Sequence, residues 1–205
     1  FTPAVEDSFV NTIFLKHSRS NGTTWWRRTA LFQLMQGVLH KAQPVTWQNV
    51  QDDKGEIYRQ WRSYRQQAVN TIDTLPDLTA ALNEYTRNLQ LLYSAAQQQH
   101  LPLVLVTQPV LYNDSLLPAA QRLLWMGGTG NFQQQGGSRY YSPRVLQQAM
   151  QLYNLQLKTF CAGKPGIKFI DLATRLNGDT SVMYDDCHFT EYGARRVAAI
   201  ISEQL

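Results

Sequence analysis

Apolar positions in the C-terminal two-thirds of the chain alternate between helical spacing and short continuous runs. Between Asp77 and about His100 they recur at intervals of three and four, which predicts a helix with one buried face. That face consists of Leu78, Leu82, Tyr85, Leu89, Leu92 and Ala96. The next run, Leu103–Thr107, is short and partly β-branched, and it ends before Gln108-Pro109. These properties predict a strand that is buried on both faces.

A second helix and a second strand follow. Ser142 and Pro143 are residue types preferred at the cap and in the first turn of a helix, so a helix is predicted to begin there and to end near Gly163. Its buried face is expected to contain Leu146, Met150, Tyr153, Leu157 and Phe160. Ile167–Ile170 predicts a short strand that ends at Asp171.

A last helix is predicted after Thr190. Its buried face is expected to contain Ala194, Val197, Ala198, Ile201 and Leu205. The order helix–strand–helix–strand–helix predicts an α/β fold with a parallel sheet covered by helices. Functional groups in such sheets lie at the carboxyl ends of the strands, where residues 108–141 and 171–186 form polar loops. The longer loop is Gly-rich around Trp125 and Phe132, which predicts a lid or a binding loop.

Residues 1–75 have a less regular pattern. They predict helices over about 24–40 and 56–71, separated by a loop over 44–55. The 205 residues fit a single domain. We expect residues 1–75 to be its helical, insert-like part and residues 76–205 to be its βα part.

Composition and charge argue against several classes of protein. The net charge is +4 without a basic block, which disfavours a dedicated nucleic-acid binder. Trp25-Trp26 beside Arg27-Arg28 is interpreted as packed aromatic residues next to a solvated charge pair, rather than as a membrane or nucleic-acid contact. No apolar run approaches the ~20 residues that span a bilayer, and no signal-peptide pattern is present. The chain begins at Phe1 rather than Met, so a targeting segment or a further piece of the fold is expected upstream.

The cysteines and histidines predict neither a disulfide nor a metal site. Cys161 ends a predicted helix and Cys187 lies in the loop beyond the next strand, which separates them by roughly 17 Å. Free thiols are therefore expected. The histidines are His17, His40, His100 and His188, and no two of them have ligand spacing. No metal or other cofactor is predicted.

The segment Tyr184–Gly193 contains the chemically most informative pattern. His188 stands just before the predicted last helix, and Asp185 lies three residues upstream. In a turn, this separation lets the carboxylate accept a hydrogen bond from the imidazole Nδ1 while Nε2 faces a pocket. The carboxylate then fixes the tautomer and stabilises the imidazolium that forms when the histidine accepts a serine proton. A helix-capping aspartate beside an incidental histidine is the alternative for this pattern taken alone.

The pattern resembles the final block of the SGNH/GDSL hydrolase family, in which Asp-x-x-His-Phe/Leu-Thr-x-x-Gly opens the last helix. The resemblance extends to Val104–Pro109, Tyr153-Asn154 and Phe169–Leu172, so it covers about residues 77–205. It implies a three-layer α/β/α fold with a parallel sheet, of the SGNH or flavodoxin-like kind, that is incomplete at its N-terminus.

By the same resemblance, His188 is the general base and Asp185 is its orienting partner. Asp186 is the rival for the aspartate role. It is interpreted as a solvated loop carboxylate, because the three-residue spacing favours Asp185. Cys187 adjoins His188 too closely for the paired geometry of a nucleophile, and it is interpreted as a packed small residue.

The family's nucleophile block, Gly-Asp-Ser, and its oxyanion residues Gly and Asn have no convincing counterpart in the chain. Glu6-Asp7-Ser8-Phe9 is a weak match, and a helix cap or a terminal position is the favoured interpretation of Ser8. Tyr112-Asn113-Asp114 imitates the Asn block, and Gly178–Ser181 is interpreted as a turn. The serine, glycine and asparagine are therefore expected upstream of Phe1.

The sequence predicts an ester hydrolase of SGNH type (an esterase, a lipase or a carbohydrate deacetylase) that uses a Ser-His-Asp triad on a small-molecule, carbohydrate or lipid ester. Acyl transfer to a sugar acceptor would use the same residues. The alternative from another class is a non-catalytic glycan- or protein-binding module on a degenerate hydrolase fold. That alternative is motivated by the missing nucleophile and by the exposed-looking tryptophans Trp25, Trp26, Trp47 and Trp61. Neither a nucleic-acid partner nor a transmembrane segment is predicted, and no oligomeric state is indicated.

Overall fold

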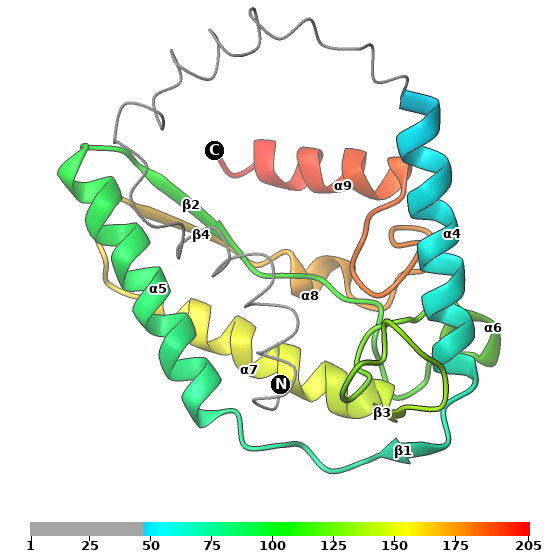
Figure 1. The fold of residues 1–205 in the computed structure, drawn as a ribbon. Coiled ribbons are helices and arrows are strands. Elements are labelled where there is room, and N and C mark those ends of the chain that lie inside the picture. The colour runs from blue at the N-terminus through cyan, green and yellow to red at the C-terminus, as the bar shows by residue number, and fades with distance from the viewer. Residues whose placement is uncertain (1–46) are drawn as a thin grey trace, which may run out of the picture.

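The structure is a computed structural model that describes residues 47–205 of the chain (Figure 1). The helix predicted over 24–40 lies outside these residues. In chain order the elements are α4 (Trp47–Gln66), β1 (Asn70–Ile72), α5 (Thr79–Gln98), β2 (Leu103–Val106), α6 (Pro118–Gln121), β3 (Arg139–Tyr141), α7 (Pro143–Cys161), β4 (Ile167–Ile170), α8 (Ala173–Leu176) and α9 (Glu191–Ser202). The predicted helices and strands of the βα part are all present, so the α/β class is confirmed.

The strands form two small parallel sheets. In one sheet β2 pairs with β4, and Leu103 lies opposite Ile167. In the other sheet β1 pairs with β3, and Asn70 lies opposite Arg139. The predicted parallel pairing is confirmed, but within residues 47–205 each sheet has two strands, and a single larger sheet is not formed.

Helices α5 and α7 lie side by side and cover one face of the β2–β4 sheet (Figure 1). The buried cluster on this face combines residues of both helices, namely Leu89, Leu157, Phe160 and Cys161. Leu105 of β2 and Phe169 of β4 pack against this cluster. The burial of apolar area between helices and sheet is the main driving force for this arrangement.

Strand β2 is buried on one side only, so the expectation of burial on both faces is wrong. Val104 is 41% exposed and Val106 is 36% exposed. Alternate residues of a strand point to opposite faces, and Leu105 points toward the α5–α7 cluster. On the second face, Ile170 at the end of β4 packs with Ile200 of α9. This contact does not extend over the two valines, which remain exposed.

The caps of α7 and α9 confirm the predicted helix starts. Ser142 Oγ accepts a hydrogen bond from the Val145 N–H at 3.3 Å, and Pro143 occupies the first turn of α7. Thr190 Oγ1 accepts a hydrogen bond from the Gly193 N–H at 2.9 Å at the start of α9. Each cap satisfies a backbone donor that the first turn of a helix leaves unpaired.

The buried faces of these helices differ in part from the predicted ones. α7 buries Leu157 and Phe160 as predicted, together with Val145, Ala149 and Cys161. The predicted residues that stay half-buried are Leu146, Met150 and Tyr153. In α9 the buried residues are Gly193 and Ile200, whereas Ala194 and Ala198 are exposed. Leu205, which was predicted on the same face, lies beyond the end of α9 and is exposed. The close approach of Gly193 to the preceding loop sets the rotation of α9 and turns Ala194 toward solvent.

Helix α4 differs from the prediction at both ends. It begins at Trp47, so most of the loop predicted over 44–55 is helical. It ends at Gln66, and part of the remaining predicted helix is strand β1. Apolar residues do not recur at helical spacing in the first turns of α4, so the sequence pattern did not predict a helix there. Residues such as Gln and Lys have a high intrinsic helix propensity, which favours a helix even without that spacing.

The long loop over residues 108–141 is packed around Trp125 and Phe132, which are 2% and 6% exposed. Trp61 of α4 lies on Trp125 with ring centroids 4.7 Å apart, and its Nε1 donates to the Gln133 carbonyl at 2.9 Å. Trp61 is therefore half-buried, and its prediction as an exposed tryptophan is wrong. The structure does not describe the side chains of the other tryptophans in that prediction, which are Trp25, Trp26 and Trp47.

Candidate active site

A tight turn between α8 and α9 carries Asp185 and His188. The backbone of Met183 pairs with that of Phe189 in an isolated antiparallel bridge. The Tyr184 N–H donates to the His188 carbonyl at 3.1 Å. The chain therefore reverses direction between these positions, and the reversal brings the aspartate and the histidine together.

Thr190 and Gly193 attach this turn to α9. Thr190 Oγ1 donates to the Ser181 carbonyl at 2.7 Å and accepts the Gly193 N–H. A Cβ atom at position 193 would lie 2.0 Å from the Val182 carbonyl oxygen, so a larger residue cannot fit without displacing the backbone. The Thr-x-x-Gly part of the sequence pattern thus holds the turn in place.

Asp185 and His188 form a closely bonded pair. Asp185 Oδ2 lies 2.8 Å from His188 Nδ1, and Oδ1 lies 3.0 Å from it. Oδ1 also accepts the backbone N–H groups of Cys187 at 3.1 Å and His188 at 2.9 Å. The indole Nε1 of Trp125 donates to Oδ2 at 3.2 Å. These donors stabilise the buried carboxylate. Its contact with Nδ1 favours the tautomer of His188 that carries the proton on Nδ1.

The opposite edge of the imidazole is open. The side chain of His188 is 40% exposed, whereas that of Asp185 is fully buried. Among residues 47–205, no group forms a hydrogen bond with His188 Nε2. A ring fixed at Nδ1 and free at Nε2 can accept a proton from an incoming hydroxyl group.

The rings of two tyrosines contact the imidazole. Tyr184 stacks on the ring with an interplanar angle of 14° and a centroid distance of 5.8 Å. Tyr58 of α4 meets it edge-on at 5.7 Å. Burial and the nearby charge of Asp185 raise the pKa of both phenols, so both remain neutral. The sequence analysis did not find Tyr58, because α4 is distant in sequence and has no chemical motif.

Asp186 is a structural residue, and its interpretation as a solvated loop carboxylate is wrong. It is fully buried. Its oxygens accept the Tyr112 hydroxyl at 2.8 Å and the backbone N–H groups of Trp125 at 2.8 Å and Met126 at 3.1 Å. Burial raises the pKa of Asp186, and these hydrogen bonds oppose the rise. Asp186 therefore attaches the long loop to the turn that carries the pair.

The ends of β2 and β4 are held by side-chain hydrogen bonds. Asn154 of α7 accepts the Gln108 N–H at 2.9 Å and donates to the Gln108 carbonyl at 3.0 Å. Thr107 Oγ1 donates to Asp171 at 2.8 Å and accepts the Ala173 N–H at 2.8 Å. Asn154 and Asp171, which belong to the sequence resemblance, thus fix the loops that leave the strands.

None of the described serines contacts the pair. The hydroxyl of Ser181 donates to Asp179, which confirms that Gly178–Ser181 is a turn. Asn113, the imitation of an oxyanion asparagine, accepts hydrogen bonds from the backbone and hydroxyl of Ser115. Ser8 lies outside the described residues.

Cys161 and Cys187 are free thiols, as predicted. Burial, with the charges of Asp185 and Asp186, raises the pKa of Cys187 to about 12. The thiol therefore remains protonated at neutral pH, which does not suit a nucleophile.

Asp185, Cys187 and His188 bring potential metal ligands within 4.8 Å of one another. Ligation of a metal by Asp185 requires an available carboxylate oxygen. The oxygens of Asp185 already accept four donor groups in the turn and from Trp125. This donor set fits a hydrogen-bonded acid–base pair better than it fits a metal.

Comparison with known proteins found no matching family model, no similar curated protein and no similar solved structure.

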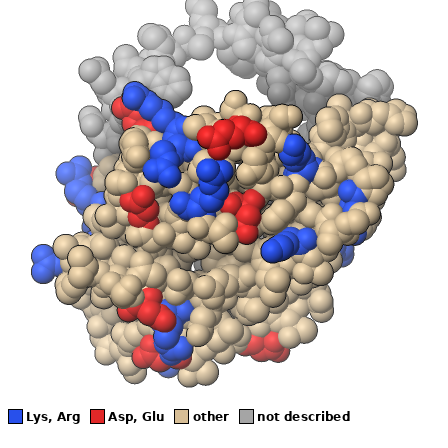
Figure 2. Space-filling model, turned by 180° about the vertical axis from the view of Figure 1, so that it is seen from behind, with Lys and Arg blue, Asp and Glu red and all other residues tan. Residues whose placement is uncertain are grey.

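The described surface adds two observations. Within residues 47–205, every helix is too short or too polar to cross a membrane. On the face drawn in Figure 2, Lys and Arg side chains lie among Asp and Glu side chains.

Proposed function

We propose that this chain supplies the general base His188 and its orienting partner Asp185 to a serine ester hydrolase of SGNH type. The observation that carries the proposal is the 2.8 Å contact between Asp185 and Nδ1 of a half-exposed imidazole with a free Nε2. This arrangement meets the requirement of a general base, whose second ring nitrogen must be accessible to the incoming hydroxyl group.

The chemistry follows the roles of the two ring nitrogens. A serine hydroxyl gives its proton to Nε2 as its oxygen attacks the ester carbonyl. Asp185 stabilises the imidazolium that forms, because its carboxylate faces Nδ1–H. Collapse of the tetrahedral intermediate returns the proton from Nε2 to the leaving alcohol. Water then hydrolyses the acyl-enzyme by the same proton transfers in a second round.

The nucleophile in this proposal lies outside residues 47–205. The candidates within the sequence are the serines of residues 1–46, namely Ser8, Ser18 and Ser20. The proposal includes a three-layer α/β/α fold, in which a further helical layer covers the second face of the β2–β4 sheet. The uncovered Val104 and Val106 support this layer, because parallel sheets are covered on both faces.

Fluorophosphonate labelling of the complete protein, followed by peptide mass spectrometry, tests the proposal. We expect label on one serine, and we expect labelling and ester turnover to be lost in His188→Ala. The peptide that carries the label identifies the source of the serine. Absence of label on every serine, or unchanged turnover in His188→Ala, would overturn the proposal.

The second candidate is a non-catalytic binding module. The observation that favours it is that no serine among residues 47–205 bonds to His188 Nε2. The same labelling experiment separates the candidates, because a binding module reacts at no serine and turns over no ester.

A further inference from the structure

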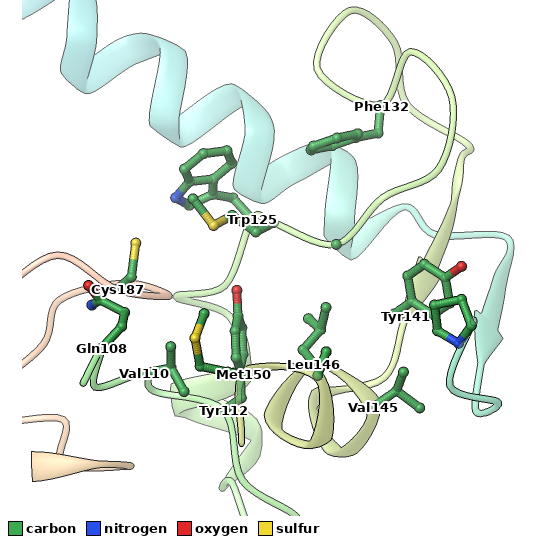
Figure 3. Close-up of a pocket in the computed structure, with 14 residues that line it drawn as sticks. Gln108, Val110, Tyr112, Trp125, Phe132, Tyr141, Val145, Leu146, Met150 and Cys187 are labelled. Atoms are coloured by element: carbon green, nitrogen blue, oxygen red, sulfur yellow. The ribbon is translucent and has the colours of Figure 1, made fainter. Parts of the chain in front are cut away.

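An apolar cavity of about 330 Å³ lies between the long loop and helix α7 (Figure 3). The loop contributes Trp125, Met126, Gly127 and Phe132 to its wall, and α7 contributes Val145, Leu146, Ala149 and Met150. A Cβ atom at Gly127 would lie 2.8 Å from a methyl group of Leu146, so the glycine brings the loop close to the helix. The cavity is therefore a consequence of how the loop is attached, and it lies outside the β2–β4 core.

One end of the cavity adjoins the catalytic pair. Cys187, which lines the cavity, directly precedes His188. Trp125 also lines it, and the indole N–H of the same residue donates to Asp185. In Figure 3, Cys187 and Gln108 lie at one end of the view and Tyr141 lies at the other.

Most of the cavity wall is apolar, and two of its polar groups already have partners. The hydroxyl of Tyr112 donates to Asp186 at 2.8 Å, and the amide of Gln108 donates to the Pro109 carbonyl at 2.7 Å. A sugar placed here would lose the hydration of its hydroxyl groups and gain few hydrogen bonds in exchange, which is unfavourable. A hydrocarbon chain loses nothing of this kind and gains apolar burial.

The volume sets the length of such a chain. An apolar cavity of about 150 Å³ holds one benzene molecule, with its six carbon atoms. By that ratio, a cavity of about 330 Å³ holds roughly 10–13 carbon atoms.

We infer that this cavity binds the acyl chain of a medium-chain ester, with roughly 10–13 carbon atoms. The carbonyl end lies toward Cys187 and Trp125, and the methyl end lies toward Tyr141. The orientation of the chain rests on the proposed hydrolase function, whereas its binding in the cavity does not. The substrate class is therefore a lipid or other fatty acyl ester, and an acetylated sugar is disfavoured.

Binding of decanoate to the complete protein, measured by titration calorimetry, tests the inference without any chemistry. Ala149→Phe fills the cavity from α7, so we expect its affinity for decanoate to fall at least about tenfold. Leu155→Phe is the matched control, because Leu155 lies on the same helix but is 58% exposed and does not line the cavity. Failure of the wild type to bind decanoate, or equal affinity in wild type and Ala149→Phe, would overturn the inference.

A second variant covers the case in which Ala149→Phe does not fold. Met150→Ala enlarges the cavity, so we expect the ratio of dodecanoate to decanoate affinity to rise several-fold. An unchanged ratio contradicts the inference.

The two proposals fail in different ways. If decanoate binds but fluorophosphonate labels no serine, the cavity is real and the hydrolase function is wrong. If turnover depends on His188 but acetyl and decanoyl esters have the same KM, the hydrolase function holds and the inference about the cavity fails.

Discussion

The two sides of Trp125 differ sharply. On one side, its backbone and indole N–H groups contact Asp186 and Asp185 in a turn where both buried carboxylates are surrounded by donors. On the other side, its ring lines an apolar cavity of about 330 Å³. The polar side is closely bonded, and the apolar side has room for a ligand.

Each side has a free-energy cost that a fully packed apolar core would not have. A buried carboxylate is unfavourable unless donors replace its hydration, and here a set of donors is assembled around each of two adjacent aspartates. An apolar cavity loses the dispersion contacts that close packing would supply. The comparison teaches that one residue separates a hydrogen-bonded polar turn from an apolar cavity.

Asp185→Asn is expected to have the largest effect. An amide in place of the carboxylate disfavours the tautomer with a proton on Nδ1 and removes the charge that stabilises the imidazolium. We expect ester turnover to fall about 10³–10⁴-fold, measured as kcat with circular dichroism as a check on folding. Asp114→Asn, a change at an exposed carboxylate, should leave turnover unchanged. A loss below tenfold in Asp185→Asn contradicts the assigned role.

Asp186→Ala tests the structural half of the polar side. The change leaves the Tyr112 hydroxyl and the backbone N–H groups of Trp125 and Met126 without their acceptor. We expect the free energy of unfolding to fall by about 3–5 kcal/mol in urea titrations. Asp186→Asn should lose less, because one acceptor oxygen remains, and Asp114→Ala should change stability by less than about 0.5 kcal/mol. Similar stability in Asp186→Ala and Asp114→Ala would show that the buried network is not as described.

The reactivity of Cys187 tests the boundary between the two sides. Its pKa is raised from 9.0 to about 12, so at pH 8.5 the native thiol keeps its proton, and thiolate accumulates only as the pH nears the raised value. In a Cys161→Ala background we expect iodoacetamide to modify the native protein at least about 100-fold more slowly than the urea-unfolded protein. Equal rates in the two states would place the thiol in solvent and contradict its position on the cavity wall.

Trp125→Phe sharpens the comparison and is expected to have the smallest effect. The phenyl ring keeps an apolar wall, but the indole donor to Asp185 is lost. We expect turnover to fall about 3–10-fold, as the loss of one hydrogen bond implies, with decanoate affinity nearly unchanged. Trp61→Phe is the control, since its indole donates to Gln133 and not to the pair. Loss of decanoate binding with unchanged turnover in Trp125→Phe would reverse the assignment of the two sides.

Local patterns in the sequence anticipated the elements whose burial and capping are local. The helix from Ser142 and the strand Ile167–Ile170 are examples, because a cap residue or a short apolar run specifies each of them. The prediction that Val104 is buried is wrong, because the two faces of a strand are covered by elements distant in sequence. The predicted buried face of α9 is wrong in part for a similar reason, since a backbone contact at Gly193 decides the rotation of the helix.

At the site, the sequence anticipated the contact of Asp185 with His188 but not their surroundings. The contact spans three residues within one turn, so local geometry is sufficient to bring the side chains together. Tyr58 and Trp125 reach the pair from segments that are 60 or more residues away in the chain, and no local pattern connects them to it.

The sequence by itself determined the α/β class, the helix caps and the spacing that lets Asp185 meet His188, because propensity, capping and short turns act over a few residues. The tertiary structure decided that Asp186 is buried, that Trp125 has one polar and one apolar side, and that a cavity adjoins the pair. These features depend on how α4, the long loop and α7 pack together. Packing depends on shape and on contacts across the whole fold, which no single segment contains.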